Sequence, residues 1–336
     1  METMYIIKRQ TIATQSGYRT ISWLNNSIID WAGGGTCYGL NGEYSQLGAY
    51  HYAYDFDRGI TSADGRYAFI YHNRGTKGLL LKDGDILREI NRSYYHASTY
   101  EYPAAFYTAA NGTTYLIHCP LEYCRLDFEE VETGKIVTDI PERAPVDIFH
   151  SRLSLSPDNR FLMVRGWAWH PLDLVRLYDI EACLSDPKLL DMGIYTDSGP
   201  IEQSIGCFIN SDEVLLGSLD FDDEEEGFPL DHIAAWNFKT GAISKPVKVS
   251  ERFGNIVGVY NGIIAWDFSG YPKIIDIRTG SVIDKMEDVS TGNQVSSIIH
   301  HIDSVPQIIF NPGLNAVAVA SSQNTIDVFS LERFNE

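Results

Sequence analysis

A short phrase recurs along this chain and limits what the chain can fold into: an apolar strand, a tight polar turn and a second apolar strand. The clearest copies are ITSADGRYAFIYH, from Ile60, and LSLSPDNRFLMVRG, from Leu153. Asp-Gly and Pro-Asp pairs suit hairpin turns because they tolerate the backbone angles of a two-strand reversal. Weaker copies begin at Trp23, Phe106, Cys207, Gly258 and Ile308. The phrase therefore predicts seven antiparallel hairpins in series.

The spacing of these copies indicates a repeat architecture. They recur at intervals of roughly 38 to 54 residues, close to the ~40–45 residues of a four-stranded propeller blade. A second phrase comes after most copies: a strand ending in Asp or a neutral substitute, then a turn and another strand. VRLYDIEA from Val175 is one example, and Thr-Gly pairs mark the same turn at 133–134, 240–241 and 279–280. Helical periodicity is missing nearly everywhere, which also favours an all-β chain.

These turns and strands resemble those of the WD-repeat β-propellers, although the full Gly-His…Trp-Asp signature of that family is absent. The resemblance covers the whole chain and implies an all-β, seven-bladed β-propeller of four-stranded antiparallel blades. The last copy, from Val305, supplies only three strands, so we expect MYIIKRQTI at the N-terminus to complete the last blade. Such closure removes exposed sheet edges. We therefore expect one domain over residues 1–336.

Known WD-repeat propellers usually bind partners on the face that carries the loops between the second and third strands and the loops between blades. The resemblance places four segments of this chain on that face: 49–57, 92–103, 166–173 and 218–232. They are rich in Tyr and Trp, which are common in binding hot spots. The candidate partner-binding residues are Asp220, Phe221, Asp222, Asp223, Glu224, Glu225, Glu226, Phe228, Trp167, Trp169, His170, Tyr52, Tyr54, Tyr94, Tyr95 and Tyr100.

Each candidate segment has a structural alternative. Tyr52 and Tyr54 alternate, as residues on one side of an ordinary strand do. Trp167 and Trp169 alternate in the same way, so that one could pack inside the blade while the other faces water. The acidic segment around Glu225 is equally consistent with a solvated insertion. It does not match a calcium-binding EF-hand loop, because Glu225 stands where that loop needs Gly.

Charge suggests the chemistry of a partner. The chain has 26 basic and 45 acidic residues, a formal net charge of −19. Such a surface repels nucleic acid and anionic membranes and attracts cationic proteins at long range, and it also keeps a protein soluble. We expect a basic protein partner, no nucleic acid or membrane partner, and a monomer when the partner is absent.

No catalytic motif is found: the chain lacks a GxSxG elbow, a P-loop, a GxGxxG after a strand and an HExxH. We expect a non-catalytic binding module without a cofactor or metal. One alternative is an immunity protein that neutralises a cationic toxin, and another is a hydrolase or lyase built on a propeller. The N-terminal segment has too short an apolar run for a signal peptide, and the five cysteines are sparse and odd in number. Both observations favour a cytoplasmic protein.

Overall fold

The turn phrase folds in the same way in its two clearest copies. In each, the serine hydroxyl donates a hydrogen bond to the aspartate two residues later, from Ser62 to Asp64 and from Ser156 to Asp158, both at 2.6 Å. Gly65 then takes a φ of 75°, a conformation that glycine adopts without steric cost. The local chemistry of the turn thus fixes each hairpin before any long-range contact is made.

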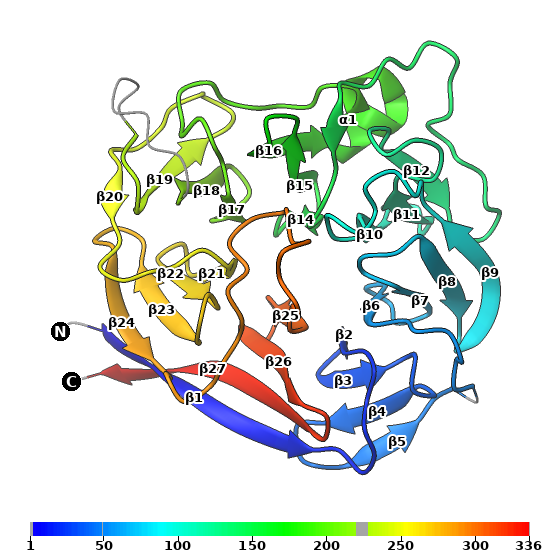
Figure 1. Ribbon diagram of the computed structural model, residues 1–336, viewed down its shortest axis with the longest axis horizontal. Helices are drawn as coiled ribbons and strands as arrows, with labels where there is room; N and C mark the ends of the chain where they lie inside the picture. The colour runs from blue at the N-terminus through cyan, green and yellow to red at the C-terminus, as the bar shows by residue number, and fades with distance from the viewer. Residues whose placement is uncertain (1–2, 49, 220–227, 336) are drawn as a thin grey trace.

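The computed structural model describes residues 3–48, 50–219 and 228–335, and within these ranges the strands form seven antiparallel sheets. The sheets follow one another around a ring (Figure 1). The chain is therefore a seven-bladed β-propeller, as the sequence predicted, with mostly four-stranded blades.

The strands fall into blades in chain order. Blade 1 contains β2 (Ser22–Leu24), β3 (Ser27–Asp30), β4 (Thr36–Gly39) and β5 (Tyr44–Gln46), and blade 2 contains β6 (Arg58–Thr61), β7 (Tyr67–Tyr71), β8 (Lys77–Lys82) and β9 (Asp85–Asn91). Blade 3 contains β10 (Ala104–Thr108), β11 (Thr114–His118) and β12 (Asp127–Glu130), and blade 4 contains β13 (Ile148–Phe149), β14 (Ser154–Leu155), β15 (Phe161–Ala168) and β16 (Leu172–Asp179). Blade 5 contains β17 (Ile205–Phe208), β18 (Glu213–Ser218), β19 (His232–Asn237) and β20 (Val247–Lys248), and blade 6 contains β21 (Ile256–Tyr260), β22 (Ile264–Asp267), β23 (Lys273–Asp276) and β24 (Ser281–Lys285). Blade 7 contains β25 (Ile308–Asn311), β26 (Ala316–Ser322), β27 (Thr325–Asn335) and β1 (Thr3–Ala13).

Two blades depart from the predicted four-strand pattern. Blade 3 has three strands in the described part of the chain. In blade 4 the phrase VRLYDIEA continues into a helix, α1 (Ile180–Ser185), and then a 3-10 turn at Pro187–Leu190, instead of an outer strand. The expectation of a second strand there was wrong because Asp179 caps the helix, its side chain accepting a hydrogen bond from the Ala182 amide at 3.2 Å. The inner strand of blade 4 is split in two, since both β13 and β14 pair with β15.

Closure by the N-terminal strand is confirmed. β1 pairs with β27 along its whole length, and the two ends of the chain lie side by side in Figure 1. Arg9 Nη2 and Thr11 Oγ1, both on β1, donate to the fully buried carboxylate of Asp327 on β27, at 2.8 and 2.5 Å. Burial by itself would raise the pKa of Asp327, but these hydrogen bonds outweigh it and hold the pKa below its ordinary value. The seam is therefore held by a buried ionic contact as well as by strand pairing.

A long connection enters the centre of the ring. Residues 289–307, between β24 and β25, contain no strand, and Figure 1 shows this orange segment running into the middle of the propeller. We call it the central strap. Its Ile298 forms an isolated β-bridge with Tyr100, and the Ile299 amide donates to the Thr99 carbonyl at 2.8 Å. Arg74 in blade 2 donates to the Ile302 carbonyl at 2.8 Å. The strap therefore ties blades on opposite sides of the ring together.

Apolar clusters fill the space between neighbouring blades. Between blades 6 and 7, for example, Trp266, Phe268 and Phe329 are fully buried in one cluster. Burial of large aromatic side chains between sheets is the main favourable contribution to the stability of such a ring. Among the described residues, no helix has the length and apolar character needed to span a membrane.

Candidate partner-binding face

The predicted loops occupy the positions in the topology that the sequence indicated. Residues 47–57 connect β5 to β6, residues 92–103 connect β9 to β10, and residues 169–171 join β15 to β16. The fourth loop joins β18 to β19, but Asp220 through Glu226, Phe221 included, lie outside the described residues. Phe228, at the end of that loop, is buried. Three of the four loops can therefore be examined as a surface.

A stacked aromatic base lies beneath two of these loops. Phe149 stacks on Trp167 with ring centroids 3.9 Å apart and planes 4° apart, and Tyr100 packs edge-on against Phe149 at 5.4 Å. Trp167 is 2% exposed and Tyr100 is 1% exposed. Burial raises the pKa of Tyr100 to about 12, so its hydroxyl stays protonated at neutral pH. We call these three residues the aromatic base.

A second layer of aromatic side chains covers this base and reaches solvent. His96 packs edge-on against Trp169, with ring centroids 5.1 Å apart, and Tyr95 packs against Tyr123 at 4.8 Å. Trp169 is 42% exposed, Tyr95 is 41% exposed and Tyr94, beside it, is 86% exposed. We call Tyr94, Tyr95, His96, Tyr123 and Trp169 the aromatic platform. Its members come from blades 2, 3 and 4, so the platform exists only in the folded ring.

Arg92 fixes the loop that carries most of the platform. Its guanidinium donates to five backbone carbonyls, which belong to Asn73, Gly75, Ala97, Tyr100 and Glu101. The same group lies over the rings of Tyr100 and Tyr102, at 4.6 and 4.8 Å from their centroids. Such a network holds an irregular loop rigid, because most of its carbonyls could not otherwise be satisfied away from water.

The hairpin that carries Trp169 is fixed from the other side by the central strap. The Ser297 amide donates to Asp173 Oδ1 at 3.0 Å, and the Ser297 hydroxyl donates to the same atom. Ile298 packs against the aromatic base. At the tip of the hairpin His170 is exposed and has a φ of 103°, an uncommon backbone conformation for a residue with a side chain. Such strained backbone persists only where its surroundings hold it, and it often marks a functional loop.

One edge of the platform is acidic. The Tyr123 hydroxyl donates to Asp147 Oδ1 at 2.5 Å. Burial and this hydrogen bond to a carboxylate raise the pKa of Tyr123. The exposed Leu121 lies two residues before Tyr123 in the chain. The surface thus combines aromatic rings, an aliphatic side chain and a negative charge.

The structure separates the predicted site residues into groups. Tyr94, Tyr95, Trp169 and His170 are exposed, whereas Trp167 and Tyr100 are in the interior and support the surface from below. The alternation of Trp167 and Trp169 was interpreted correctly: one packs in the blade and the other faces water. The tyrosines of the 47–57 loop form a separate group, since Tyr52 and Tyr54 pack on Phe56 at 6.2 and 5.0 Å.

Sequence reasoning missed several members of the cluster. Phe149, Tyr123 and Leu121 lie in blades 3 and 4, outside the four segments that were selected. Phe149 gave no local signal because its importance comes from stacking on Trp167 across β13 and β15. His96 lies inside the selected segment 92–103 but was not among the candidate residues. In the described ranges, no group of three or more His, Cys, Asp or Glu side chains is arranged to hold a metal ion.

Comparison with known proteins adds no relative to this description. No known protein family matches the sequence, and no curated protein resembles it closely enough to be counted as a match.

Proposed function

We propose that this protein is a binding module that holds a basic protein partner on the aromatic platform. The observation that carries the proposal is the two-layer construction of the platform. The exposed rings of Tyr95 and Trp169 rest on a base of stacked, buried rings, and Tyr94 beside them is exposed. A surface that is already ordered loses little conformational entropy when a partner binds, and Tyr and Trp contribute much contact area for few rotatable bonds.

The charge of the chain supports a basic partner. The net charge of −19 gives long-range attraction to a cationic protein, and Asp147 places a carboxylate at the edge of the platform. The six carboxylates between Asp220 and Glu226 add negative charge to the loop that follows β18. In this proposal the aromatic rings supply affinity and the carboxylates speed association.

We extend the proposal in two ways. We also propose, on the basis of the turn phrases and the ring, that the chain is a divergent relative of the WD-repeat propellers, which use the corresponding loops for partners. Masking of a basic toxin is a narrower form of the same binding role, and it is distinguished by the partner's own activity. If the purified partner cleaves nucleic acid and this activity stops when the protein is added, the protein acts by masking a toxin.

The test compares wild-type protein with a variant carrying Tyr94→Ala and Trp169→Ala. Both proteins are immobilised and exposed to extract from the native cell, and the partner retained by the wild type is identified and then purified. Each exposed aromatic anchor typically contributes more than about 1 kcal/mol to binding, so we expect the dissociation constant of the double variant to rise about tenfold or more.

A matched control is available on blade 1. Tyr44 on β5 is exposed but lies outside the platform, and Tyr44→Ala should leave the dissociation constant unchanged. Melting curves must show that all variants are folded. If the double variant binds the purified partner as tightly as the wild type does, the platform is not the binding site.

We also propose that the protein binds without turnover. The test is incubation of the wild type with glycoside, ester and phosphate substrates. Hydrolysis that follows the protein through purification and is lost on substitution of an exposed carboxylate such as Asp147 would contradict this part of the proposal.

A further inference from the structure

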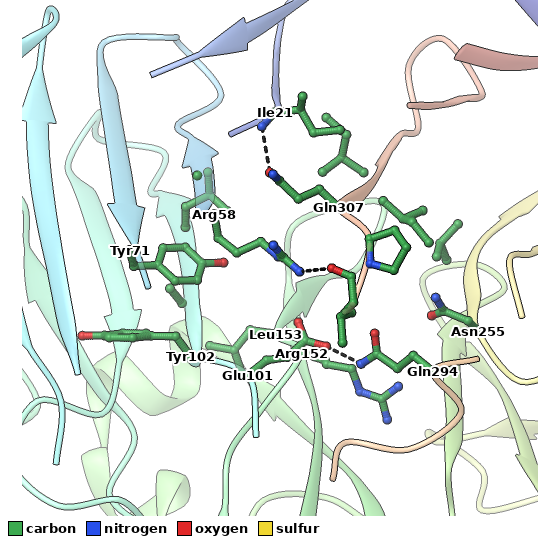
Figure 2. Close-up of a pocket in the computed structure, with 18 of the residues that line it drawn as sticks. Ile21, Arg58, Tyr71, Glu101, Tyr102, Arg152, Leu153, Asn255, Gln294 and Gln307 are labelled. Carbon is green, nitrogen blue, oxygen red and sulfur yellow. Dashed lines mark hydrogen bonds between the residues drawn. The ribbon is translucent and has the colours of Figure 1, made fainter. Parts of the chain in front are cut away.

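A cavity of about 200 Å³ lies in the middle of the ring. It is lined by residues of the innermost strands or beside them, such as Ile60, Val257 and Ile309, and the central strap contributes Gln294 and the segment 305–307. Figure 2 shows Arg58, Glu101 and Gln294 with their polar ends toward this space. The cavity is smaller than the ~300–1,000 Å³ typical of pockets for drug-sized ligands, so it fits a small molecule or ion.

The polar lining of the cavity is mainly cationic. Arg58, Arg152 and Arg165 all line it, and Glu101 is the single carboxylate among the described lining residues. Glu101 already accepts a hydrogen bond from Gln294 Nε2. Three positive charges against one negative charge is unexpected inside a chain whose overall net charge is −19.

The three guanidinium groups are hydrogen-bonded only to backbone carbonyls in the described part of the chain. Arg58 donates to the Asp57 and Val305 carbonyls at 2.8 and 2.7 Å, and none of the three arginines forms an ion pair there. Arg152 Nη2 donates to a carbonyl at 3.2 Å, and Arg165 Nε donates to the Arg152 carbonyl at 3.3 Å. A carbonyl satisfies a donor but does not neutralise a buried charge.

Arg152 also has spare hydrogen-bonding capacity. It is 9% exposed, and its buried Nε has no hydrogen-bond partner among the described residues. Burial and the nearby charge of Arg152 lower the pKa of Arg165 to about 10, so Arg165 still carries its charge at neutral pH. Two like charges, one buried on Arg152 and one partly buried on Arg165, therefore repel each other in this part of the cavity.

Another buried cation in the same protein shows the usual arrangement. Lys273 is fully buried in blade 6, and its ammonium group lies 2.8 Å from Asp267, which is also fully buried. At this position the buried cation therefore has its counter-charge in direct contact. The arginines of the cavity form no such ion pair among the described residues, and Glu101, the one carboxylate in the lining, only partly offsets the charge of Arg165.

We propose that the central cavity binds a small oxyanion of the phosphate class, held mainly by Arg152 and Arg165 and supported by Arg58. Guanidinium groups bind phosphate oxygens through paired, charge-assisted hydrogen bonds, and a dianion would neutralise the two like charges. The side-chain amide of Asn255, also in the lining, offers a neutral donor. The central strap, whose Val305 carbonyl accepts from Arg58, then covers the bound ion.

The experiment is calorimetric titration of the purified protein with inorganic phosphate, against sodium chloride at matched ionic strength. We expect saturable binding of phosphate and none of chloride. Removing one charge-assisted contact by Arg165→Gln should raise the dissociation constant about tenfold or more. Arg176→Gln is the matched control, because Arg176 is also partly buried in blade 4 but stacks on Tyr195, with Cζ 4.0 Å from the ring centroid, away from the cavity. It should leave phosphate binding unchanged.

Glycerol 2-phosphate in a parallel titration separates the sources of the phosphoryl group. Binding of both compounds assigns the site to phosphate monoesters as well, and binding of inorganic phosphate alone restricts it to the free ion. Absence of saturable phosphate binding, or equal binding by wild type and Arg165→Gln, would overturn the proposal.

Thermal unfolding distinguishes a loss of phosphate binding from a loss of stability in the substituted protein. The melting temperature of the wild type should rise with phosphate concentration, while that of Arg165→Gln should not. Without phosphate, Arg165→Gln should melt at or above the wild-type temperature, since one of two repelling charges is gone. A lower melting temperature together with an unchanged phosphate response would show that Arg165 is only structural. Arg152→Gln, measured in the same way, provides an independent second variant.

Discussion

The aromatic base beneath the platform and the central cavity take side chains from the same strand, β15, but the arginines in the two regions differ in how their donors are used. Trp167 extends into the aromatic base, and Arg165, two residues earlier, lines the cavity. Beneath the platform, Arg92 uses its donors on five carbonyls and two aromatic rings. In the cavity, Arg165 donates to two carbonyls at 3.3 and 3.4 Å, and the Nε of neighbouring Arg152 has no partner within the described part of the chain.

This difference helps to distinguish a buried arginine that only supports the structure from one that can bind a ligand. A buried cation whose donors are all used makes a loop rigid and has nothing left to offer a ligand. A buried cation with spare donors and no counter-charge destabilises the ligand-free protein. Binding of an anionic ligand can offset that destabilisation. The following predictions test how far the two regions differ, from the largest expected effect to the smallest.

Opening the ring should damage both regions at once. Deletion of residues 1–10 removes the buried Ile7 and leaves the buried Asp327 without Arg9. We expect a loss of at least about 5 kcal/mol in the free energy of unfolding, because an apolar side chain is exposed and a buried charge is left unpaired. Denaturant titration gives the value, and phosphate binding should fail with it. An unchanged melting curve would contradict a closed ring.

The same substitution at Arg92 and at Arg165 should have different effects. Arg92→Gln leaves several buried carbonyls unsatisfied and should lower the free energy of unfolding by about 4 kcal/mol. Arg165→Gln should change it by less than about 1 kcal/mol in phosphate-free buffer, because a repulsion is lost with the hydrogen bonds. Denaturant unfolding measures both values. Equal decreases in the free energy of unfolding for the two variants would contradict the difference proposed between Arg92 and Arg165.

Low pH should lower the free energy of unfolding through a histidine on the segment that joins the aromatic base to the cavity. His150 lies between Phe149 of the aromatic base and Arg152 of the cavity, and its Nε2 donates to the Cys124 carbonyl at 3.0 Å. Burial lowers the pKa of His150 to about 4 from its ordinary value of 6.5. Below pH 6.5 the imidazole of His150 is therefore protonated in the unfolded chain but not in the folded chain. The free energy of unfolding falls as the pH drops toward 4.

Protonation of His150 should lower the free energy of unfolding by up to about 3 kcal/mol between pH 6.5 and 4. Unfolding free energies at several pH values should show it, and His150→Gln provides the control because glutamine keeps a donor but does not titrate. The difference between the two proteins should disappear above pH 6.5 apart from a constant offset. A pH profile of the same slope in both proteins would mean that His150 is not held neutral.

Charge outside both regions should matter least for stability. Changing Asp220, Asp222, Asp223, Glu224, Glu225 and Glu226 to their amides should alter the free energy of unfolding by less than about 0.5 kcal/mol, or raise it slightly. Association with a basic partner should slow and lose most of its salt dependence, since electrostatic steering raises association rates by roughly 10–10³-fold. Stopped-flow mixing at several salt concentrations measures this.

The control for that experiment lies on the turn between β8 and β9, where Asp83 and Asp85 are exposed. Neutralising these two carboxylates should have little effect on the association rate. If the neutralised acidic segment associates at the wild-type rate in low salt, the segment is only a solvated insertion.

The sequence allowed the fold to be predicted because the hairpins are encoded locally. Ser62 and Asp64 build their turn from neighbouring atoms, so the phrase can be recognised without any distant contact. The unpaired last repeat then indicated closure by the N-terminal strand. The helix after Asp179 was missed because the same residues suit either a turn or a helix cap, and packing against blade 3 favours the helix.

The site was predictable only in part, because exposure depends on distant residues. Tyr94 and Trp169 were identified from composition, but nothing local shows that Tyr100 is covered by the central strap through Ile298. Arg165 resembles any outward-facing strand residue in VRGW until the ring surrounds it. The cavity is formed by residues from most of the blades, and no single stretch of sequence contains its pattern.

The pairing of β1 with β27 also has a consequence for how the protein folds as it is made. Thr3 pairs with Asn335 and Ala13 with Thr325, so the first strand of blade 7 is synthesised long before the strand it pairs with. Throughout that interval β1 presents a free hydrogen-bonding edge, which can pair with another nascent chain. Contacts of such long sequence separation form slowly. Correct closure of the ring therefore depends on β1 not pairing with another chain before β27 has been synthesised.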